Sequence, residues 1–363
     1  MKVFSGIEGG ASRTRCVIGD ETGKLLGVGY GGPSNYLTVS METVKKSLRE
    51  ALDGALKVCG VSRSLEGAYV GLAGIGLLHQ PLILENTVQK VTGSKKTFIN
   101  NDGYVAMQGA FAGGPGIILV SGTGSIAMGS NEDGNVARVG GWGHILGDEG
   151  SGFHLGLEGV RAVTRAHDGL LPSTELTEKA LSFFAVERVE ELVGVFYLDG
   201  VGKETLASFS EEVLAAASRG DGVAVEIVAS ECKALKQMVR VLRARLSFDT
   251  PRLALFGGVF EGSQWFTNRF IEELGDDAEV VKPQFSPVTG AFMLALTSSC
   301  IKLTPEIIEN IRESENALLR QSRRWIVAAC SLAYHLQLFL NVFDSDFLLL
   351  PTLHISKLNK SPF

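Results

Sequence analysis

The sequence predicts an α/β protein made of two domains with mixed sheets and a cleft between them. The chain has 363 residues, enough for two domains of about 150 residues. Three strand patterns lead into alternating helix and strand patterns, and this order restarts after a glycine-rich break at residues 112–116. Glycine accounts for 44 residues without a collagen-like period, which indicates tight turns and close backbone approaches to a ligand.

The first unit begins with three strands, the second and third joined by a turn at residues 21–24. A helix follows, because apolar residues from Val44 to Cys59 keep helical spacing, Ser40 can cap its start and Gly60 can end it. The predicted strands of this unit are residues 2–6, 13–19, 25–30, 67–72 and 96–100, and its two further helices are residues 80–92 and 103–111.

The second unit repeats this plan and adds a large helical insertion. Its predicted strands are residues 117–121, 125–130, 136–139, 252–256 and 279–282, and its helices are residues 150–167, 175–184, 206–218, 223–246 and 287–296. We expect an N-terminal domain at 1–115, completed by a helix at 287–300, and a C-terminal domain at 116–286. Residues 301–363 form an extension of unknown role that begins with a charged helix at 305–320.

Charge, cysteine pattern and hydropathy narrow the classes of partner. A net charge of −6 gives no basic excess for nucleic acid. Five scattered cysteines without a CxxC pair disfavour a disulfide framework or a zinc ribbon, and together with the lack of a signal-peptide pattern they favour the cytoplasm. Residues 325–343 carry no formal charge, but polar His335, Gln337 and Asn341 favour a packed extension over a membrane anchor.

Two glycine-rich turns occupy equivalent places in the two units and predict a pair of phosphate-binding loops. Gly9, Gly10 and Ser12 follow the first strand, and Gly122 and Thr123 follow the first strand of the second unit. Backbone N–H groups and hydroxyls in such turns can bind a polyphosphate from two sides. Each turn taken alone also fits an ordinary hairpin, and neither is a P-loop or a GxGxxG motif.

Two aspartates stand where polar chemistry is expected. Asp102 follows the fifth strand, where it can orient a hydroxyl nucleophile and accept its proton, or simply cap the next helix. Asp148 lies in residues 140–152, of which six are glycine, and can accept hydrogen bonds from sugar hydroxyls. Asp148 and Glu149 also fit the first turn of a helix, where acidic side chains are favourable. His144 and His154 lack metal-site spacing, so a zinc site is not expected and His144 is interpreted as structural.

Two weaker segments complete the candidate site. Gly257 and Gly258 end an apolar strand, where a nucleotide could approach the backbone, although a buried strand with a turn fits equally well. Asn35 lies in a loop at residues 33–36, and its amide offers both a donor and an acceptor to a sugar, while the loop itself also fits a plain turn.

Taken together, the motifs GIEGGASRT, GGPSNY, INND, VSGTGS, GGWGHILGDEGS and LFGGVF resemble those of the N-acetylglucosamine kinases. These belong with the benzoyl-CoA-reductase-activator type ATPases in the superfamily of sugar kinases, heat-shock ATPases and actin. The resemblance covers about residues 1–300, and residues beyond about 320 find no counterpart. It implies two ribonuclease-H-like (actin-like ATPase) domains that bind ATP, with Mg²⁺, and a sugar in the cleft between them.

The resemblance also implies roles for individual residues. Asp102 matches the general base, Ser12 replaces a usual threonine in the first phosphate loop, and Glu8 replaces a common aspartate that could hold Mg²⁺ through water. The direct metal ligands are not identified. The residues that match the sugar site are Asn35, Asp102, Ser125, Ile126, Gly141, Trp142, Gly143 and Asp148, and those that match the nucleotide side, besides the phosphate loops and Gly257, are Ala207 and Gly258.

The implied activity is ATP-dependent phosphorylation of the 6-hydroxyl of N-acetylglucosamine, in a cytoplasmic protein that could form a homodimer by analogy. Glucosamine, N-acetylmuramic acid or another hexose are alternative acceptors. A nucleotide-switch ATPase acting on a protein partner is the alternative from another class, disfavoured because no cysteine lies in a cluster-binding motif. A catalytically weak sugar sensor is a third alternative.

Overall fold

The computed structural model describes residues 1–60, 64–76 and 82–318. The first of its two sheets contains β1 (Val3–Gly9), β2 (Thr14–Asp20), β3 (Leu25–Gly31), β4 (Gly67–Leu72) and β5 (Lys96–Asn101). The second contains β6 (Gly116–Ser121), β7 (Ser125–Ser130), β8 (Val136–Gly140), β9 (Arg252–Phe256) and β10 (Glu279–Val280).

Both sheets have the same strand order, β3-β2-β1-β4-β5 in the first and β8-β7-β6-β9-β10 in the second. In each, the first three strands pair antiparallel, and the last two add to the first strand in parallel. The predicted architecture of two mixed sheets is therefore confirmed, and the second unit repeats the first. Parallel addition brings the carboxyl ends of three strands to one edge of each sheet, where ligands of α/β proteins usually bind.

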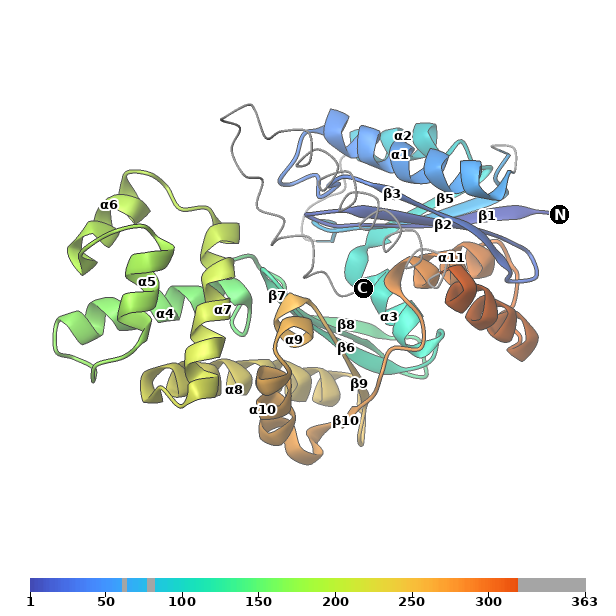
Figure 1. Cartoon of the computed structure of the whole chain (residues 1–363). Helices are drawn as coiled ribbons and strands as arrows, with labels where there is room; N and C mark the ends of the chain where they lie inside the picture. The colour runs from blue at the N-terminus through green and yellow to red at the C-terminus, as the bar shows by residue number, and fades with distance from the viewer. Residues whose placement is uncertain (61–63, 77–81, 319–363) are drawn as a thin grey trace, which may run out of the picture.

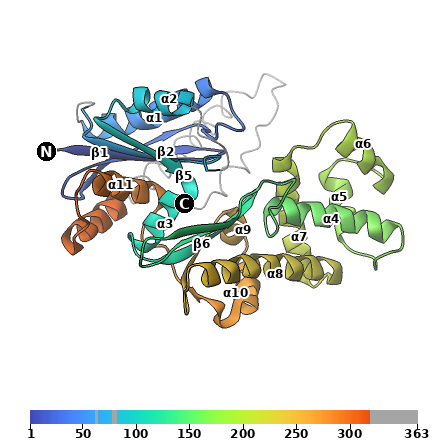
Figure 2. The ribbon, with the colours of Figure 1, turned by 180° about the vertical axis from the view of Figure 1, so that it is seen from behind.

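Helices and sheets alternate in layers (Figure 1; Figure 2 shows the reverse side). The outer face of the first sheet packs against α1 (Met41–Cys59) and α2 (Leu82–Thr92), and its inner face packs against α11 (Pro287–Ser298). The inner face of the second sheet packs against α3 (Asp102–Phe111), and its outer face packs against α8 (Gly222–Arg245), next to α10 (Gln264–Leu274). The helices α3 and α11 lie against each other between the two sheets.

Residue alternation along β1 decides which side chain meets which layer. Ile7 is fully buried among the residues of α1 and α2, whereas Phe4 is fully buried against α11. Gly6 lies on the Phe4 face, and a Cβ there would come within 2.1 Å of the Phe292 backbone nitrogen. Glycine is therefore required for α11 to approach the sheet this closely. Glu8 continues the same inner face toward the strand end.

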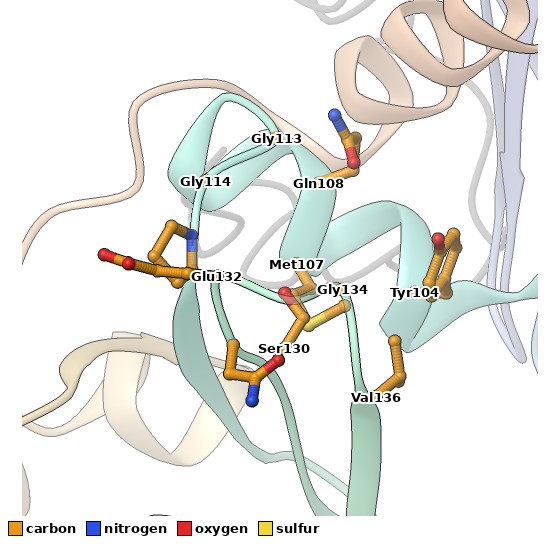
Figure 3. Close-up of a pocket in the computed structure, with 11 residues that line it drawn as sticks. Tyr104, Met107, Gln108, Gly113, Gly114, Ser130, Glu132, Gly134 and Val136 are labelled. Carbon is orange, nitrogen blue, oxygen red and sulfur yellow. The ribbon is translucent and has the colours of Figure 1, made fainter. Parts of the chain in front are cut away.

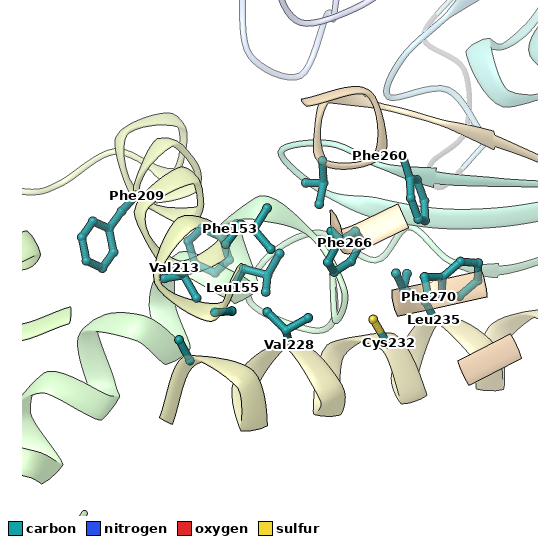
Figure 4. Packing of buried hydrophobic residues seen from close by; sticks show 14 of the residues in the cluster. Phe153, Leu155, Phe209, Val213, Val228, Cys232, Leu235, Phe260, Phe266 and Phe270 are labelled. Atoms are coloured by element: carbon teal, nitrogen blue, oxygen red, sulfur yellow. The ribbon is translucent and has the colours of Figure 1, made fainter. Parts of the chain in front are cut away.

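The helical insertion lies between β8 and β9 and shares one core with the second sheet. Phe153, Phe209, Val228 and Leu235 are among the buried residues of this core (Figure 4). The elements of the insertion before α8 are α4 (Gly152–His167), α5 (Leu176–Phe183), the 3₁₀ turn η1 (Val189–Glu191), α6 (Leu192–Tyr197) and α7 (Lys203–Arg219). The short helix α9 (Gly258–Gly262) follows β9, and the 3₁₀ turn η2 (Gly275–Asp277) follows α10.

Several predicted boundaries were wrong, and α6, α9 and α10 were missed. The helix predicted from residue 150 begins at Gly152, because Ser151 caps it by accepting a hydrogen bond from the His154 N–H at 3.2 Å. The last strand is only Glu279–Val280, since its two residues are all that pair with β9. For α10, Ser263 supplies a cap and Phe266, Phe270 and Leu274 supply helical spacing, so the sequence held a signal that was not used.

The chain after α11 continues as a helix from residue 305 through residue 318, within the predicted range of 305–320. Ile311 of this helix is fully buried beside α11. The apolar segment at residues 325–343 lies outside the described residues. Among the helices that the structure describes, none is long and apolar enough to cross a membrane.

Candidate active site

The first predicted phosphate loop is a tight turn at the end of β1. The Gly10 N–H donates to the Arg13 carbonyl at 2.9 Å, and the Gly10 carbonyl accepts from the N–H groups of Ser34 and Asn35 at 3.0 and 3.2 Å. Gly9 lies against the loop that carries Ser34 and Asn35, because a Cβ at Gly9 would come within 2.0 Å of the Ser34 hydroxyl oxygen. The structure therefore brings Gly9, Gly10 and Asn35 together and leaves Ser12 exposed at the tip.

Asp102 follows β5 at the same edge of the sheet. Glu8 of β1 pairs with Gly71 of β4, which pairs with Asn100 of β5. Glu8 and Asp102 are therefore both near the carboxyl ends of the parallel strands that flank β4. The cap of α3 is Asn101, which accepts from the Tyr104 N–H at 2.7 Å, so the prediction that Asp102 caps this helix was wrong. Asp102 instead accepts from the Gly103 N–H at 3.0 Å.

The environment of Asp102 makes it a better base than an ordinary carboxylate. Burial raises its pKa to about 6, and the like charge of Glu8 adds to the increase. Glu8 itself accepts a hydrogen bond from the Arg15 guanidinium at 3.0 Å. Arg15 was not among the predicted site residues, although Arg15 and Glu8 stand directly opposite each other in the β1–β2 hairpin. A carboxyl with a pKa near 6 is ionised at neutral pH and accepts protons more readily than a free aspartate.

The second predicted phosphate loop joins β6 to β7. The Gly122 N–H donates to the Gly124 carbonyl at 2.9 Å, and the Gly122 carbonyl accepts from the Gly152 N–H at 2.8 Å. The first turn of α4 therefore adjoins this loop. Thr123 is exposed, and its carbonyl accepts from the Phe153 N–H at 3.3 Å. The exposed Thr123 hydroxyl is thus available to a ligand.

The predicted nucleotide-side residues lie around this second loop. Gly257 has a φ of 103°, and a Cβ there would come within 2.3 Å of the Ser121 carbonyl oxygen. A Cβ at Gly152 would come within 3.3 Å of the Ala207 carbonyl oxygen, which places α7 beside the loop. The structure therefore gathers Gly122, Thr123, Ala207, Gly257 and Gly258 in one region.

Asp148 belongs to the same region but not to a helix. Its φ is 70°, its side chain accepts from the Ser125 N–H at 3.3 Å, and only 7% of the residue is exposed. The Ser125 hydroxyl donates to the Glu149 carbonyl at 2.7 Å. The prediction that Asp148 and Glu149 begin α4 was wrong, because these contacts hold them in the preceding loop. Burial raises the pKa of Asp148, opposed by the Ser125 N–H and the charge of Lys203.

The glycine-rich segment before Asp148 folds back on β7. The Gly141 N–H donates to the Ser125 carbonyl at 2.9 Å, and a Cβ at Gly141 would come within 2.7 Å of Ile126 Cδ1. Trp142 is 58% exposed, and the Arg138 guanidinium lies 4.8 Å from the centre of its ring. The neighbouring Gly143 has a φ of 84°, and nothing in the described chain lies within 4 Å of a Cβ placed there. Of the predicted sugar residues of the second unit, Gly141 and Asp148 thus contact Ser125, and Trp142 and Gly143 follow Gly141 in the chain.

The candidate residues form two groups, one at each sheet. Within the described ranges, no hydrogen bond joins the loop at residues 9–12 to the loop at residues 122–124. The connection is α3, which begins with Asp102 and packs on β6 and β7, where a Cβ at Gly103 would come within 2.5 Å of Met128 Sδ. The described part of the chain holds no group of three or more His, Cys, Asp or Glu residues that could bind a metal ion.

A cavity of about 180 Å³ lies elsewhere, between α3 and the β7–β8 turn (Figure 3). Its lining includes Tyr104, Gln108, Ser130 and Glu132. None of the predicted site residues lines it, so this cavity is separate from the candidate active site.

Comparisons with known proteins identify the family and its relatives. A family model described as the BadF/BadG/BcrA/BcrD ATPase family matches residues 5–295. The chain is 33% identical over 273 residues to the N-acetylmuramic acid/N-acetylglucosamine kinase of Clostridium acetobutylicum, covering 74% of this chain and 89% of that protein. It is 26% identical over 314 residues to the N-acetyl-D-glucosamine kinase of Dictyostelium discoideum, covering 82% and 98%.

Solved structures show the same fold. A crystal structure from Chromobacterium violaceum, described as a candidate N-acetylglucosamine kinase, matches with a TM-score of 0.66 and 25% identity and covers 82% of this chain and 99% of that one.

Proposed function

Because the chain belongs to the BadF/BadG/BcrA/BcrD ATPase family, we propose that it is a kinase that transfers the γ-phosphoryl group of ATP to the 6-hydroxyl of N-acetylglucosamine. Both curated relatives described above are named as kinases of this sugar. The observation that carries the chemistry is Asp102, a carboxylate with a pKa raised to about 6 at the strand-end edge beside the first glycine loop.

In the proposed reaction, the sugar O6 attacks the γ-phosphorus. The O6–P bond forms, the bond between the γ-phosphorus and the bridging oxygen of ADP breaks, and Asp102 accepts the O6 proton. Phosphoryl transfer passes through a loose transition state, so positioning and charge stabilisation matter more than strong deprotonation. A carboxylate that orients the hydroxyl and then takes its proton satisfies both needs.

The remaining residues bind and orient the two substrates. The N–H groups of residues 9–12 and 122–124, with the exposed Thr123 hydroxyl, are proposed to bind the ATP phosphates. Gly257 and Ala207 line the proposed nucleotide side. Asn35, Asp148 and the segment at residues 141–143 are proposed to bind the sugar. Closure of these groups around both substrates would exclude water and limit ATP hydrolysis.

Mg²⁺ fits this site as part of the nucleotide complex. Mg²⁺ usually keeps several waters and binds through substrate phosphates and one or two carboxylates rather than an all-protein cage. The described residues offer carboxylates for such a complex, because Glu8 and Asp102 lie close together at the strand ends. Bound there, Mg²⁺ supplies positive charge that neutralises the phosphates.

The first test measures ADP release with Mg-ATP across a sugar panel. The panel contains N-acetylglucosamine, N-acetylmuramic acid, glucosamine, N-acetylmannosamine, glucose and a well without sugar. We expect release that depends on N-acetylglucosamine, and phosphate at O6 in the product by NMR. Release with N-acetylmuramic acid alone would mean that this sugar, and not N-acetylglucosamine, is the acceptor. Equal ADP release in every well, including the well without sugar, would contradict the kinase proposal and favour a nucleotide-switch ATPase.

The second test replaces the proposed base. Asp102→Asn should keep sugar binding but lower kcat by at least about 100-fold, which is a typical contribution of a positioned base. Asp249→Asn is the matched control, because Asp249 is exposed and precedes β9, at the opposite end of that strand from Gly257. Near-normal turnover in Asp102→Asn would remove Asp102 from this role.

A further inference from the structure

A carboxylate outside the predicted site is buried in the middle of α8. Glu231 is only 3% exposed, and its helix neighbours Val228, Cys232 and Leu235 all belong to the apolar core (Figure 4). Burying a carboxylate is costly unless hydrogen-bond partners compensate the lost water. The position of this group therefore depends on its partners.

Both oxygens of Glu231 bind the segment that carries Asp148. The Gly150 N–H donates to Oε2, and Nδ1 of His154 lies 2.8 Å from Oε1. Gly150 is two residues after Asp148, and His154 is in the first turn of α4. One side chain of α8 thus holds the loop and the helix start together.

Gly150 connects this contact to the rest of the candidate site. Its carbonyl accepts from the Ser121 hydroxyl at 2.6 Å, at the end of β6. Its φ is 79°, and a Cβ there would come within 2.2 Å of Leu235 Cγ, so the backbone lies directly on α8. The Ser151 N–H donates to the Asp148 carbonyl at 3.1 Å. A shift of the Gly150 peptide would therefore move Asp148.

We propose that Glu231 is a positioning residue for sugar binding, which holds the loop at residues 148–151 in its binding conformation through the Gly150 N–H and His154. This inference rests on the proposed function of Asp148 in sugar binding. Glu231 touches neither the candidate phosphate loops nor Asp102 by any hydrogen bond within the described residues. Ser121 keeps its place through the pairing of β6 with β7 and β9, so the loss of Glu231 should affect sugar more than ATP.

The charge on His154 offers a readout that a purely structural role would not produce. The hydrogen bond that His154 donates to Glu231 of α8 raises the pKa of His154, and Glu158 of α4 and Glu149 of the loop act in the same direction, while burial opposes them. In Glu231→Gln, the amide nitrogen would face Nδ1. Neutral His154 can accept from that amide, but protonated His154 cannot. The defect of this variant should therefore be larger at low pH.

The experiment compares Glu231→Gln and Glu231→Leu with Glu226→Gln, an exposed position on the same helix. KM for N-acetylglucosamine and for ATP is measured at pH 6 and pH 8.5. We expect Glu231→Leu to raise the sugar KM about 10-fold at both values, a common effect of misplacing a binding group, with ATP KM within twofold. Glu231→Gln lacks the carboxylate that raises the pKa of His154, so it should show part of that defect at pH 6 and recover toward wild type at pH 8.5.

Equal changes in both KM values, or none, would overturn the proposal, and Glu231→Gln tests it even if the leucine variant does not fold. A second measurement needs no turnover. Amide hydrogen exchange in peptides covering residues 143–155 should accelerate at least about 10-fold in Glu231→Gln at pH 6, relative to Glu226→Gln. Unchanged exchange would also overturn the positioning role. If the wild-type protein shows no sugar-dependent ADP release, the kinase proposal fails, while exchange still decides whether Glu231 holds the loop.

Discussion

Among single residues, Asp102 is the one whose ionisation the proposed reaction depends on. Its raised pKa means that the carboxyl binds a proton as the pH falls through about 6, and a protonated base cannot accept the O6 proton. We therefore expect kcat/KM for the sugar to fall about tenfold per pH unit below pH 6. Burial is the main cause and the charge of Glu8 is the second, so Glu8→Gln should move this acid limb to lower pH.

The measurement is a pH–rate profile of wild type, Glu8→Gln and the exposed control Glu132→Gln from pH 4.5 to 8. The position of the limb is compared rather than the maximal rate, because Glu8 is close enough to the site to change the rate itself. A limb that stays in place in Glu8→Gln would mean that Glu8 does not raise the pKa of the essential group.

At this scale, the sequence predicted where Asp102 is but not what surrounds it. Its place after a strand follows from a local apolar pattern. Its raised pKa comes first from burial and second from the charge of Glu8, and Glu8 comes near Asp102 only through the register of β1, β4 and β5. Glu231 was missed for a related reason, although an acidic residue on the apolar face of α8, between Val228 and Leu235, was a readable signal.

Among the elements, the turn from β9 into α9 depends most clearly on one residue. Gly257 combines a φ of 103° with a Cβ position 2.3 Å from the Ser121 carbonyl oxygen. Gly257→Ala should therefore lower the free energy of unfolding by about 2 kcal/mol or more and raise KM for ATP, because Ser121 leads into the loop at residues 122–124. Gly262→Ala in α9 is the control, since nothing in the described chain lies within 4 Å of the position that its methyl group would take.

Denaturant unfolding and KM for ATP provide the measurement. If Gly257→Ala matched Gly262→Ala in both, the close approach of the two turns would be of no consequence. In the sequence, Gly257 and Gly258 were recognisable as paired glycines at the end of an apolar strand, and the resemblance placed Gly258 on the nucleotide side. A plain turn remained an equal alternative, because the partner of this turn, Ser121, comes from the other side of the helical insertion.

For the whole molecule, the repeat of one strand order in two units was the property that the sequence predicted best. The restart of the strand pattern after residues 112–116 predicted two equivalent sheets, and their strand orders agree. The placement of the helices between the sheets was harder to predict. The helix α3 directly follows β5, yet its apolar residues Ala106, Met107 and Ala110 pack on the second sheet. The apolar spacing of a helix cannot show which of the two sheets it packs on, because either sheet would bury the same face of the helix.

The helix at residues 305–318 should matter to this layered arrangement through α11. Glu315 Oε1 accepts from the Ser286 N–H, the Ser286 hydroxyl and the Thr289 hydroxyl at 3.1, 2.7 and 2.7 Å, all at the start of α11. In turn, α11 approaches α3 closely, since a Cβ at Gly290 would come within 2.1 Å of the Val105 carbonyl oxygen. Glu315→Ala would leave these donors without their acceptor between the two sheets.

We therefore expect Glu315→Ala to lower the free energy of unfolding by about 2 kcal/mol, the usual range for hydrogen bonds to a charged group. Glu313→Ala, at an exposed position of the same helix, should change it by less than about 0.5 kcal/mol. Urea unfolding followed by circular dichroism measures both. Equal stability of the two variants would mean that the helix merely lies on the surface of α11. A selective loss would instead make residues 305–318 part of the folded unit that holds α3, and with it Asp102, in place.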